Sequence, residues 1–283
     1  MSALEATMIT ITAMGETGPF DDLPSFERPP VVEVAVGVHF LQLPGLNTVG
    51  LVRLVDDLWR GKFPQTVEQP LAPPLPPPGR APMVAFQLQT AFPPIRLWSL
   101  TEDESILIQV QHDRLLLNWR KVKEDDPYPR YKRLRSDFAE AWQEFSTYVG
   151  GREDFGVLQP SVAEVSFFNG VPMESATRIP AFVKALNPQW ELTGQIAAAY
   201  QLEREIADGA ASGNQNIALN FRPENGHMHL EISTRIEIDT ATDGVSDVMD
   251  SLDSAHRVGV LTFDSVTTEE AHSTWGRRDA GNG

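Results

Sequence analysis

Basic side chains gather in one segment of an otherwise acidic chain. Between residues 120 and 135, seven basic residues stand against three acidic ones, whereas the whole chain carries a formal charge of -16. Arginine and lysine bind phosphate or carboxylate groups, and tyrosine rings can stack on flat ligands. A solvated loop balanced by the acidic remainder is the alternative interpretation. The predicted ligand- or partner-binding residues are Arg120, Lys121, Lys123, Tyr128, Arg130, Tyr131, Lys132, Arg133 and Arg135.

A second group of side chains has the spacing of metal ligands on a strand. His227, His229 and Glu231 occupy alternate positions, so they share the face opposite Met228 and Leu230. A divergent metal-assisted enzyme acting on a phosphate-bearing substrate could use these three groups. An exposed polar strand face after a turn is the competing interpretation, and the lack of a further fixed ligand favours it. No cofactor is therefore predicted.

Two glutamates interrupt apolar strands at corresponding places in the two halves of the chain. Glu33 lies within 30–41, and Glu164 lies within 161–169. A carboxylate pair of this kind could serve acid–base chemistry or metal binding. Each glutamate could instead lie on the sheet face away from the helices, or pair with an arginine such as Arg96.

Familiar catalytic motifs are absent from the sequence. We find no Walker loop, no dinucleotide-binding glycine pattern, no Gly-x-Ser-x-Gly elbow and no His-Glu-x-x-His helix. The chain has no cysteine, which excludes disulfides, thiolate zinc sites and a cysteine nucleophile. No catalytic residue is predicted, and a non-catalytic binding or regulatory protein is the leading hypothesis.

Composition narrows the class of protein further. A content of 41% hydrophobic and 22% charged residues is typical of a soluble globular chain. The sequence shows neither an apolar run of roughly 20 residues nor a secretion signal, so we expect a cytoplasmic protein without membrane contact. The acidic charge argues against broad nucleic-acid binding. The expected partner is another protein or an anionic ligand, and homo-oligomerisation stays open.

The elements that must position these residues begin with the strand at 30–41. Valines at 32, 34, 36 and 38 alternate onto one face, which is typical of a half-buried strand. A fainter copy at 161–169 opens the second half, at an offset of 131 residues. Both halves then show a strand, a helix, antiparallel strands and a long helix. The order predicts an α+β fold of duplicated β-α-β(3-4)-α units, with a curved antiparallel sheet and long helices on one face.

The predicted boundaries follow from this repeat. Residues 1–28 form a flexible lead-in, 29–152 the first repeat and 153–283 the second. A proline-rich connector at 64–82 is expected to be a stiff extended spacer, or else a docking peptide for an aromatic groove. Helices are predicted at 47–60, 131–148, 179–186, 243–255 and 267–275, and further strands at 84–88, 96–98, 106–110, 115–119, 190–205, 217–221 and 228–236.

Two resemblances accompany this pattern. The order of elements resembles the TATA-binding-protein-like arrangement in topology only. The acidic charge of the chain and the lack of regular basic positions on its strands argue against DNA binding. The segments Pro-Pro-Val-Val-Glu-Val at 29–34, Leu-Asn-Trp-Arg at 117–120, Tyr-Pro-Arg-Tyr at 128–131 and Trp-Gly-Arg at 275–277 resemble a sporadically distributed bacterial family of uncharacterised proteins of about this length. That resemblance implies no activity or site residue. Its patchy occurrence would suit a defence or toxin-neutralising role.

Overall fold

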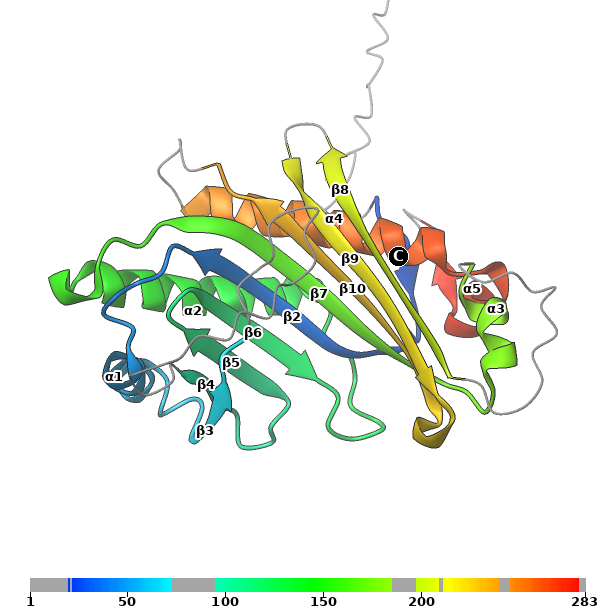
Figure 1. Cartoon of the computed structure of the whole chain (residues 1–283), viewed down its shortest axis with the longest axis horizontal. Helices are drawn as coiled ribbons and strands as arrows, with labels where there is room; N and C mark the ends of the chain where they lie inside the picture. Colours follow the sequence, from blue (N-terminus) through cyan, green and yellow to red (C-terminus); the bar gives the residue numbers. More distant parts are fainter. Residues whose placement is uncertain are drawn as a thin grey trace, which may run out of the picture.

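The computed structural model describes most of the chain and shows an α+β fold. Within the described residues, helices and a large antiparallel sheet account for the architecture (Figure 1). No helix in this part of the chain is long and apolar enough to cross a membrane. The described residues are 20, 22–72, 95–184, 197–208, 211–239 and 245–279.

The main sheet contains nine strands among the described residues. Its order is β3-β4-β5-β6-β2-β7-β10-β9-β8, and every neighbouring pair is antiparallel. The strands are β2 (Val31–Phe40), β3 (Gln65–Pro70), β4 (Ile95–Leu100), β5 (Ile106–Gln111), β6 (Arg114–Arg120), β7 (Pro160–Pro172), β8 (Ala198–Asp208), β9 (Ala211–Arg222) and β10 (His227–Glu237). A separate two-stranded sheet joins β1 (Ser25–Phe26) to β11 (Arg277–Arg278).

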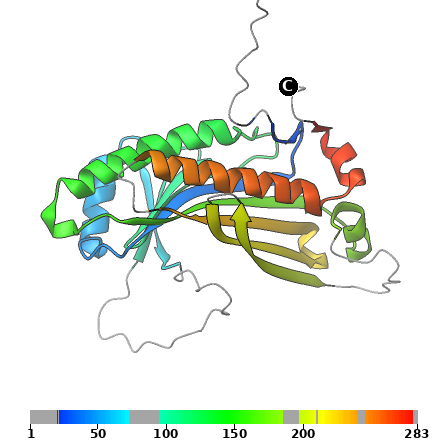
Figure 2. The same ribbon diagram turned by 90° about the horizontal axis from the view of Figure 1, so that it is seen from above.

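Two long helices lie side by side on one face of the main sheet (Figure 2). The helix α2 (Tyr131–Gly150) contacts β6 and β2, and α4 (Val245–Val266) contacts β10 and β7. The shorter helices are α1 (Thr48–Leu58), α3 (Ile179–Phe182) and α5 (Glu269–Trp275), with 3-10 turns at Glu153–Phe155, Ala176–Arg178 and Pro223–Asn225. The predicted one-sided arrangement of the long helices is confirmed.

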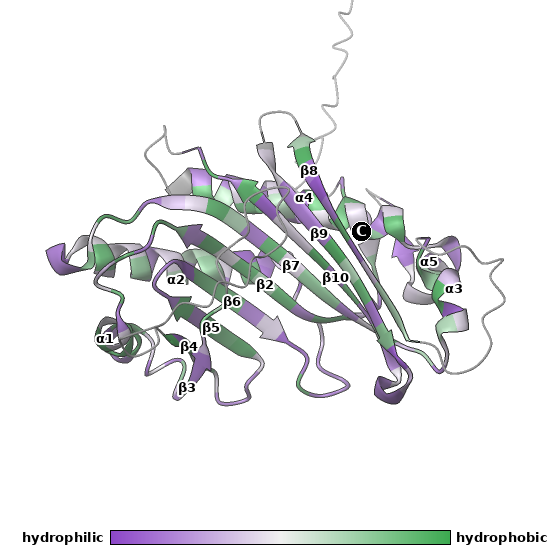
Figure 3. Ribbon diagram, viewed as in Figure 1, coloured by the Kyte–Doolittle hydropathy of each residue, from purple (hydrophilic) through white to green (hydrophobic). Residues whose placement is uncertain are grey.

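Hydrophobic and hydrophilic residues alternate along the strands, and the long helices cover the hydrophobic face of the sheet (Figure 3). On β2, Val34, Val36 and Val38 are fully buried in the core. On α2, side chains at helical spacing meet them, and the ring of Phe40 lies 5.3 Å from that of Phe145. Burial of such apolar side chains supplies the main stabilisation of this layer, about 1.5–3 kcal/mol for each. The opposite sheet face carries the polar members of each strand.

The two predicted repeats meet in the middle of the sheet. The first strand of each half, β2 and β7, pair with each other, with Gly37 opposite Glu164 and Ala35 opposite Ser166. Both halves therefore contribute to one continuous sheet. Gly37 tolerates no side chain, because an added Cβ would lie 2.6 Å from the carbonyl oxygen of Leu115. Internal duplication stays a prediction.

Several predicted boundaries differ from the structure. Residues 65–70 of the proline-rich connector form β3 at the edge of the sheet, where the missing N–H of Pro70 is tolerated. The predicted lead-in contributes β1 at its end. The short helix expected at 179–186 stops at Phe182. The expected strand at 84–88, most of the lead-in, the rest of the connector and the start of the strand at 190–205 lie outside the described residues.

Candidate ligand pocket

A pocket of about 330 Å³ opens between the start of α2, the middle of α4, the ends of β2 and β7 and the segment that follows residue 20. Most of its lining is aromatic or aliphatic. Two cationic residues, Arg130 and Lys132, belong to the same lining and are exposed. The main lining residues are Phe20, Leu23, Phe26, Val31, Tyr128, Arg130, Tyr131, Lys132, Phe167, Asn169, His256, Val260 and Phe263.

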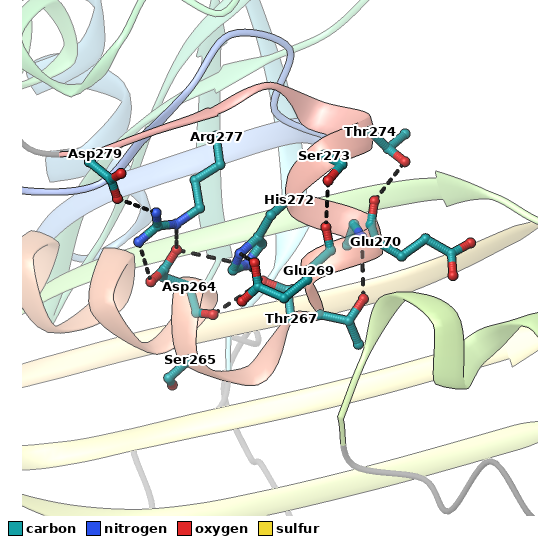
Figure 4. Close-up of polar contacts among 12 residues, drawn as sticks. Asp264, Ser265, Thr267, Glu269, Glu270, His272, Ser273, Thr274, Arg277 and Asp279 are labelled. Carbon is teal, nitrogen blue, oxygen red and sulfur yellow. Dashed lines mark hydrogen bonds and ion pairs between the residues drawn. The ribbon is translucent and has the colours of Figure 1, made fainter. Parts of the chain in front are cut away.

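The N-terminal wall of the pocket is held in place by the C-terminal end of the chain. Phe26 pairs with Arg277 in the two-stranded sheet, and its ring lies 5.2 Å from that of Phe263. The guanidinium of Arg277 binds both carboxylate oxygens of Asp264, at 2.5 Å and 3.1 Å (Figure 4). Bidentate pairs of this type fix geometry as well as charge. The pocket wall therefore depends on residues about 250 positions apart in the sequence.

The wall between the two long helices is made by two polar contacts and one ring stack. The ring of Tyr131 stacks on the imidazole of His256, with centroids 3.8 Å apart and planes 9° apart. Its hydroxyl donates to Asp253 at 3.0 Å, and Arg135 donates to both oxygens of the same carboxylate, at 2.6 Å and 2.9 Å. Burial, together with the charge of Asp253, raises the pKa of the Tyr131 hydroxyl above its usual range.

His256 and Asn169 are buried polar residues of the pocket, and Asn169 donates to the carbonyl oxygen of Leu230 at 3.0 Å. His256 is only 8% exposed, and burial lowers the pKa of the imidazole to about 3. The ring is therefore neutral near pH 7. Its Nδ1 atom has no hydrogen-bond partner in the described part of the chain. Buried polar atoms are nearly always paired, so an unpaired one requires an explanation.

The mouth of the pocket is a helix N-terminus without a cap. Arg130 occupies the N-cap position of α2, yet no side chain among the described residues accepts a hydrogen bond from the first turn, and that turn contains no acidic residue. The first amide groups of a helix lack intrahelical partners and carry partial positive charge. Arg130 and Lys132 add two full charges there, and neither forms an ion pair with a described carboxylate. The arrangement favours an anion.

Arg130 is held in an unusual backbone conformation. Its φ of 68° and ψ of 154° lie in a region that residues with a Cβ rarely adopt. The guanidinium donates to the carbonyl oxygens of Phe26 at 2.9 Å and Glu27 at 3.4 Å. These bonds tie the start of α2 to the N-terminal wall, so Arg130 both shapes the pocket and charges its mouth.

The structure separates the nine predicted binding residues. Four of the nine line the pocket: Tyr128, Arg130, Tyr131 and Lys132. The remaining arginines are used in ion pairs elsewhere, namely Arg120 with Glu104, Arg133 with Asp137 and Arg135 with Asp253. Lys121 and Lys123 are exposed in the loop before α2.

The two tyrosine rings of this segment are packed into the protein. Tyr131 is 4% exposed and has one ring face on His256. The ring of Tyr128 lies 5.4 Å from that of Trp119. Both residues line the pocket.

The predicted metal ligands do not converge in the structure. His227 and His229 are exposed at the start of β10, with ring centroids 6.4 Å apart. The carboxylate of Glu231 accepts a hydrogen bond from Ser233 at 2.7 Å. Among the described residues, no group of three histidine, aspartate or glutamate side chains has an arrangement that could hold a metal ion.

Glu33 and Glu164 lie on the sheet face away from the long helices, in contrasting environments. Burial alone would raise the pKa of Glu164, but His39 at 2.8 Å and Arg235 at 2.9 Å hold it well below its usual range. Burial raises the pKa of Glu33, and the charge of Glu231 adds to the rise, against a hydrogen bond from Asn118.

The arginine that pairs with one of these glutamates is Arg235. The expectation of Arg96 in that role is wrong for Glu164, because Arg96 lies on β4, separated from β7 by three strands, and donates to Gln109 at 3.0 Å. Arg235 is directly opposite Glu164 in the pairing of β10 with β7. The arginine partner of Glu164 on β7 therefore comes from the neighbouring strand β10.

Sequence reasoning missed His256 and the N-terminal side of the pocket. A weak signal exists for His256, which follows Leu252 by four residues and therefore continues the buried stripe of α4. No local pattern indicates that Phe20 and Phe26 pack across these helices, because those contacts join residues far apart in the chain.

Comparisons with known proteins add no family assignment. No protein-family model matches the chain, and no curated protein matches it significantly.

Proposed function

We propose that the protein is a non-catalytic binding protein whose pocket takes a small anionic ligand with an apolar body. The observation that carries this proposal is the position of Arg130 and Lys132 at the uncapped N-terminus of α2, directly beside an aromatic pocket. A carboxylate or phosphate could accept hydrogen bonds from the first amides of α2 and face both cations. The apolar body of the ligand would occupy the interior.

The size of the pocket supports a small ligand over a protein partner. At about 330 Å³ it lies near the lower end of the range of roughly 300–1,000 Å³ found for small-molecule sites. Apolar walls with a few placed polar groups are typical of such sites. We further propose that binding takes place in the cytoplasm, in keeping with the absence of cysteine from the sequence.

The test compares two double variants of equal charge change. Arg130→Gln with Lys132→Gln removes the cations at the pocket, and Lys121→Gln with Lys123→Gln removes two exposed cations from the loop before it. Isothermal titration calorimetry with phenylacetate and hexanoate measures the dissociation constant for each protein. The pocket variant should bind at least about tenfold more weakly, which equals about 1.4 kcal/mol, while the loop variant should match the wild type.

Two outcomes would contradict the proposal. One is that neither carboxylate binds the wild-type protein at millimolar concentration. The other is an equal loss of affinity in both double variants, which would mean that general charge attraction, and not the pocket, holds the ligand. Thermal unfolding of each variant checks that the fold is retained.

A further inference from the structure

We propose that the outer edge of β8 docks an extended segment of a partner protein in which an acidic residue stands between two basic ones. Beside this edge lies a second pocket, of about 410 Å³, between β8 and α4. It shares no lining residue with the ligand pocket, so the proposal is independent of the proposed function. Arg204, Ile206 and Ala207 of β8 line it together with Val258, Leu261 and Ser265 of α4.

The backbone of β8 is paired on one side only. The strand ends the nine-stranded sheet (Figure 1), and in the described part of the chain its backbone bonds to no element other than β9. Its register with β9 is unbroken from Ala198 to Asp208, and it contains no proline. Proteins commonly block a free edge with proline or a bulge. Because β8 has neither, its outer N–H and C=O groups can pair with an added strand.

Arg204 places a positive charge beside this edge. Its guanidinium donates to the side-chain oxygens of Gln215 at 2.9 Å and of Thr262 at 2.8 Å. Thr262 also donates to Gln215, at 3.0 Å, and both of these residues are buried. Arg204 itself is exposed, and no described carboxylate forms an ion pair with it. Neutral partners therefore orient the guanidinium and leave its charge and remaining N–H donors for an acidic group.

Alternation along β8 specifies the charges that suit an added strand. Arg204 and the exposed Leu202 lie on the sheet face that α4 covers. Glu203 and Glu205, the second of which also borders the second pocket, lie on the other face. Residues directly opposite each other in paired strands share a face and interact. The matching segment therefore has an acid opposite Arg204, a basic residue opposite each glutamate and an apolar residue opposite Leu202.

A second copy of β8 does not meet these requirements. The two-fold antiparallel pairings that use most of the strand are centred on Leu202, Glu203 or Arg204. The first places Tyr200 opposite Arg204, and the other two place like charges opposite each other, which is destabilising. None of the three supplies an acid for Arg204. The charge pattern of the edge thus favours a segment of a different protein.

The experiment compares two synthetic peptides of identical composition, both with blocked ends. In an antiparallel register, Val-Lys-Glu-Lys-Leu-Thr-Val places its glutamate opposite Arg204 and its lysines opposite Glu203 and Glu205. Val-Lys-Lys-Glu-Leu-Thr-Val exchanges two neighbours and so places like charges opposite Arg204 and Glu203. Fluorescence anisotropy of the labelled peptides measures dissociation constants. The first peptide should bind the wild type at least about tenfold more tightly than the second.

A pair of variants with equal charge change tests the role of Arg204. Arg204→Gln removes the cation beside the edge, and Arg60→Gln removes an exposed cation at the end of α1. The first peptide should lose at least about tenfold in affinity for Arg204→Gln and keep its wild-type affinity for Arg60→Gln. Equal affinity of the two peptides for the wild type, or equal affinity of the first peptide for the two variants, would overturn the proposal.

Hydrogen exchange on the wild-type protein keeps the test independent of any variant's folding. Alternate amides of β8, those that face away from β9, should exchange more slowly when the first peptide is added. Unchanged exchange, or no binding of the first peptide at millimolar concentration, would overturn the proposal. Sedimentation of the protein alone supplies the last check. Self-association that protects the same amides without peptide would assign the edge to a second copy and would also overturn it.

Discussion

The ring of Tyr131 lies parallel to the imidazole of His256, with 3.8 Å between the centroids and 9° between the planes. This stack joins the first residue of α2 to the middle of α4, and Asp253 of α4 also accepts hydrogen bonds from Tyr131 and Arg135 of α2. One side of the pocket is therefore also a helix–helix contact. A ligand that touches this wall is coupled to the packing of the two long helices.

Removing the hydroxyl of Tyr131 should weaken this contact without disturbing the stack. Tyr131→Phe deletes the hydrogen bond to Asp253 and keeps the ring. Hydrogen bonds to charged groups contribute about 1.5–3 kcal/mol to stability. Because Arg135 still pairs with the carboxylate, we expect the free energy of unfolding to fall by an amount near the lower figure. Tyr131→Ala, which also removes the buried ring, should cost about 3–5 kcal/mol. Urea unfolding measures both, and equal losses would show that the ring adds nothing.

Substitution of Arg130 by glycine and by glutamine separates backbone strain from charge. Both variants remove the guanidinium and its bonds to the carbonyl groups of Phe26 and Glu27. Only glycine adopts a φ of 68° with a ψ of 154° at little cost. Arg130→Gly should therefore be about 1–3 kcal/mol more stable than Arg130→Gln. Chemical denaturation measures the stability of both variants. If Arg130→Gln were as stable as Arg130→Gly or more stable, the backbone at this position would be unstrained.

The strands could be predicted from sequence because their signal is local. Alternation of Val34, Val36 and Val38 with smaller or polar residues specifies both the strand and its buried face. The same alternation puts Glu33 and Glu164 on the face away from the long helices, but it does not indicate that Glu164 is buried there. It could not predict that Arg235 meets Glu164, because strand register is decided by pairing between distant segments.

The pocket could be predicted only in part, for a related reason. The cluster of basic residues indicated an anion-binding region. Because side chains on a helix point in different directions, Arg133 and Arg135 pair with Asp137 and Asp253, whereas Arg130 and Lys132 line the pocket. The walls come from four separate segments, which in the sequence run from Phe20 to Phe263. Their meeting follows from the tertiary fold, which one sequence does not reveal.

The buried imidazole of His256 should make the protein less stable in mild acid. Its folded-state pKa is about 3, below its unfolded value of about 6.5, so the unfolded chain binds the proton first. Stability is unaffected above pH 6.5 and falls as the pH drops toward 3, with a slope of up to about 1.4 kcal/mol per pH unit. Urea unfolding between pH 7 and pH 5 measures the slope for the wild type and for His256→Phe.

The phenylalanine variant is the matched comparison for this slope. It keeps an aromatic ring beside Tyr131 and cannot take up a proton. The slope between pH 6.5 and pH 5 should be smaller in the variant than in the wild type by up to about 1.4 kcal/mol per pH unit. Identical slopes would mean that His256 is protonated as readily in the folded protein as in the unfolded chain.

Glu33 and Glu164 should respond in opposite directions to neutralisation. Glu164→Gln leaves the half-buried Arg235 and the buried His39 without their carboxylate, so we expect a loss of about 3–5 kcal/mol at pH 7. Glu33→Gln keeps an oxygen that can accept from Asn118 and removes the repulsion from Glu231, so stability at pH 7 should hold or rise. Urea unfolding of the two variants beside the wild type measures both effects.

The pH dependence of these two variants supplies the sharper test. The folded-state pKa of Glu164 is depressed, so its stabilisation is present above its ordinary value of 4.5 and is lost as the pH falls below it. The folded-state pKa of Glu33 is raised, so its ionisation destabilises the fold as the pH rises above 4.5. The free energy of unfolding of Glu164→Gln should therefore be closest to that of the wild type in acid. The free energy of unfolding of Glu33→Gln should increase relative to the wild type as the pH rises toward neutral. A destabilised Glu33→Gln with an unaffected Glu164→Gln would reverse the assignment of the two environments.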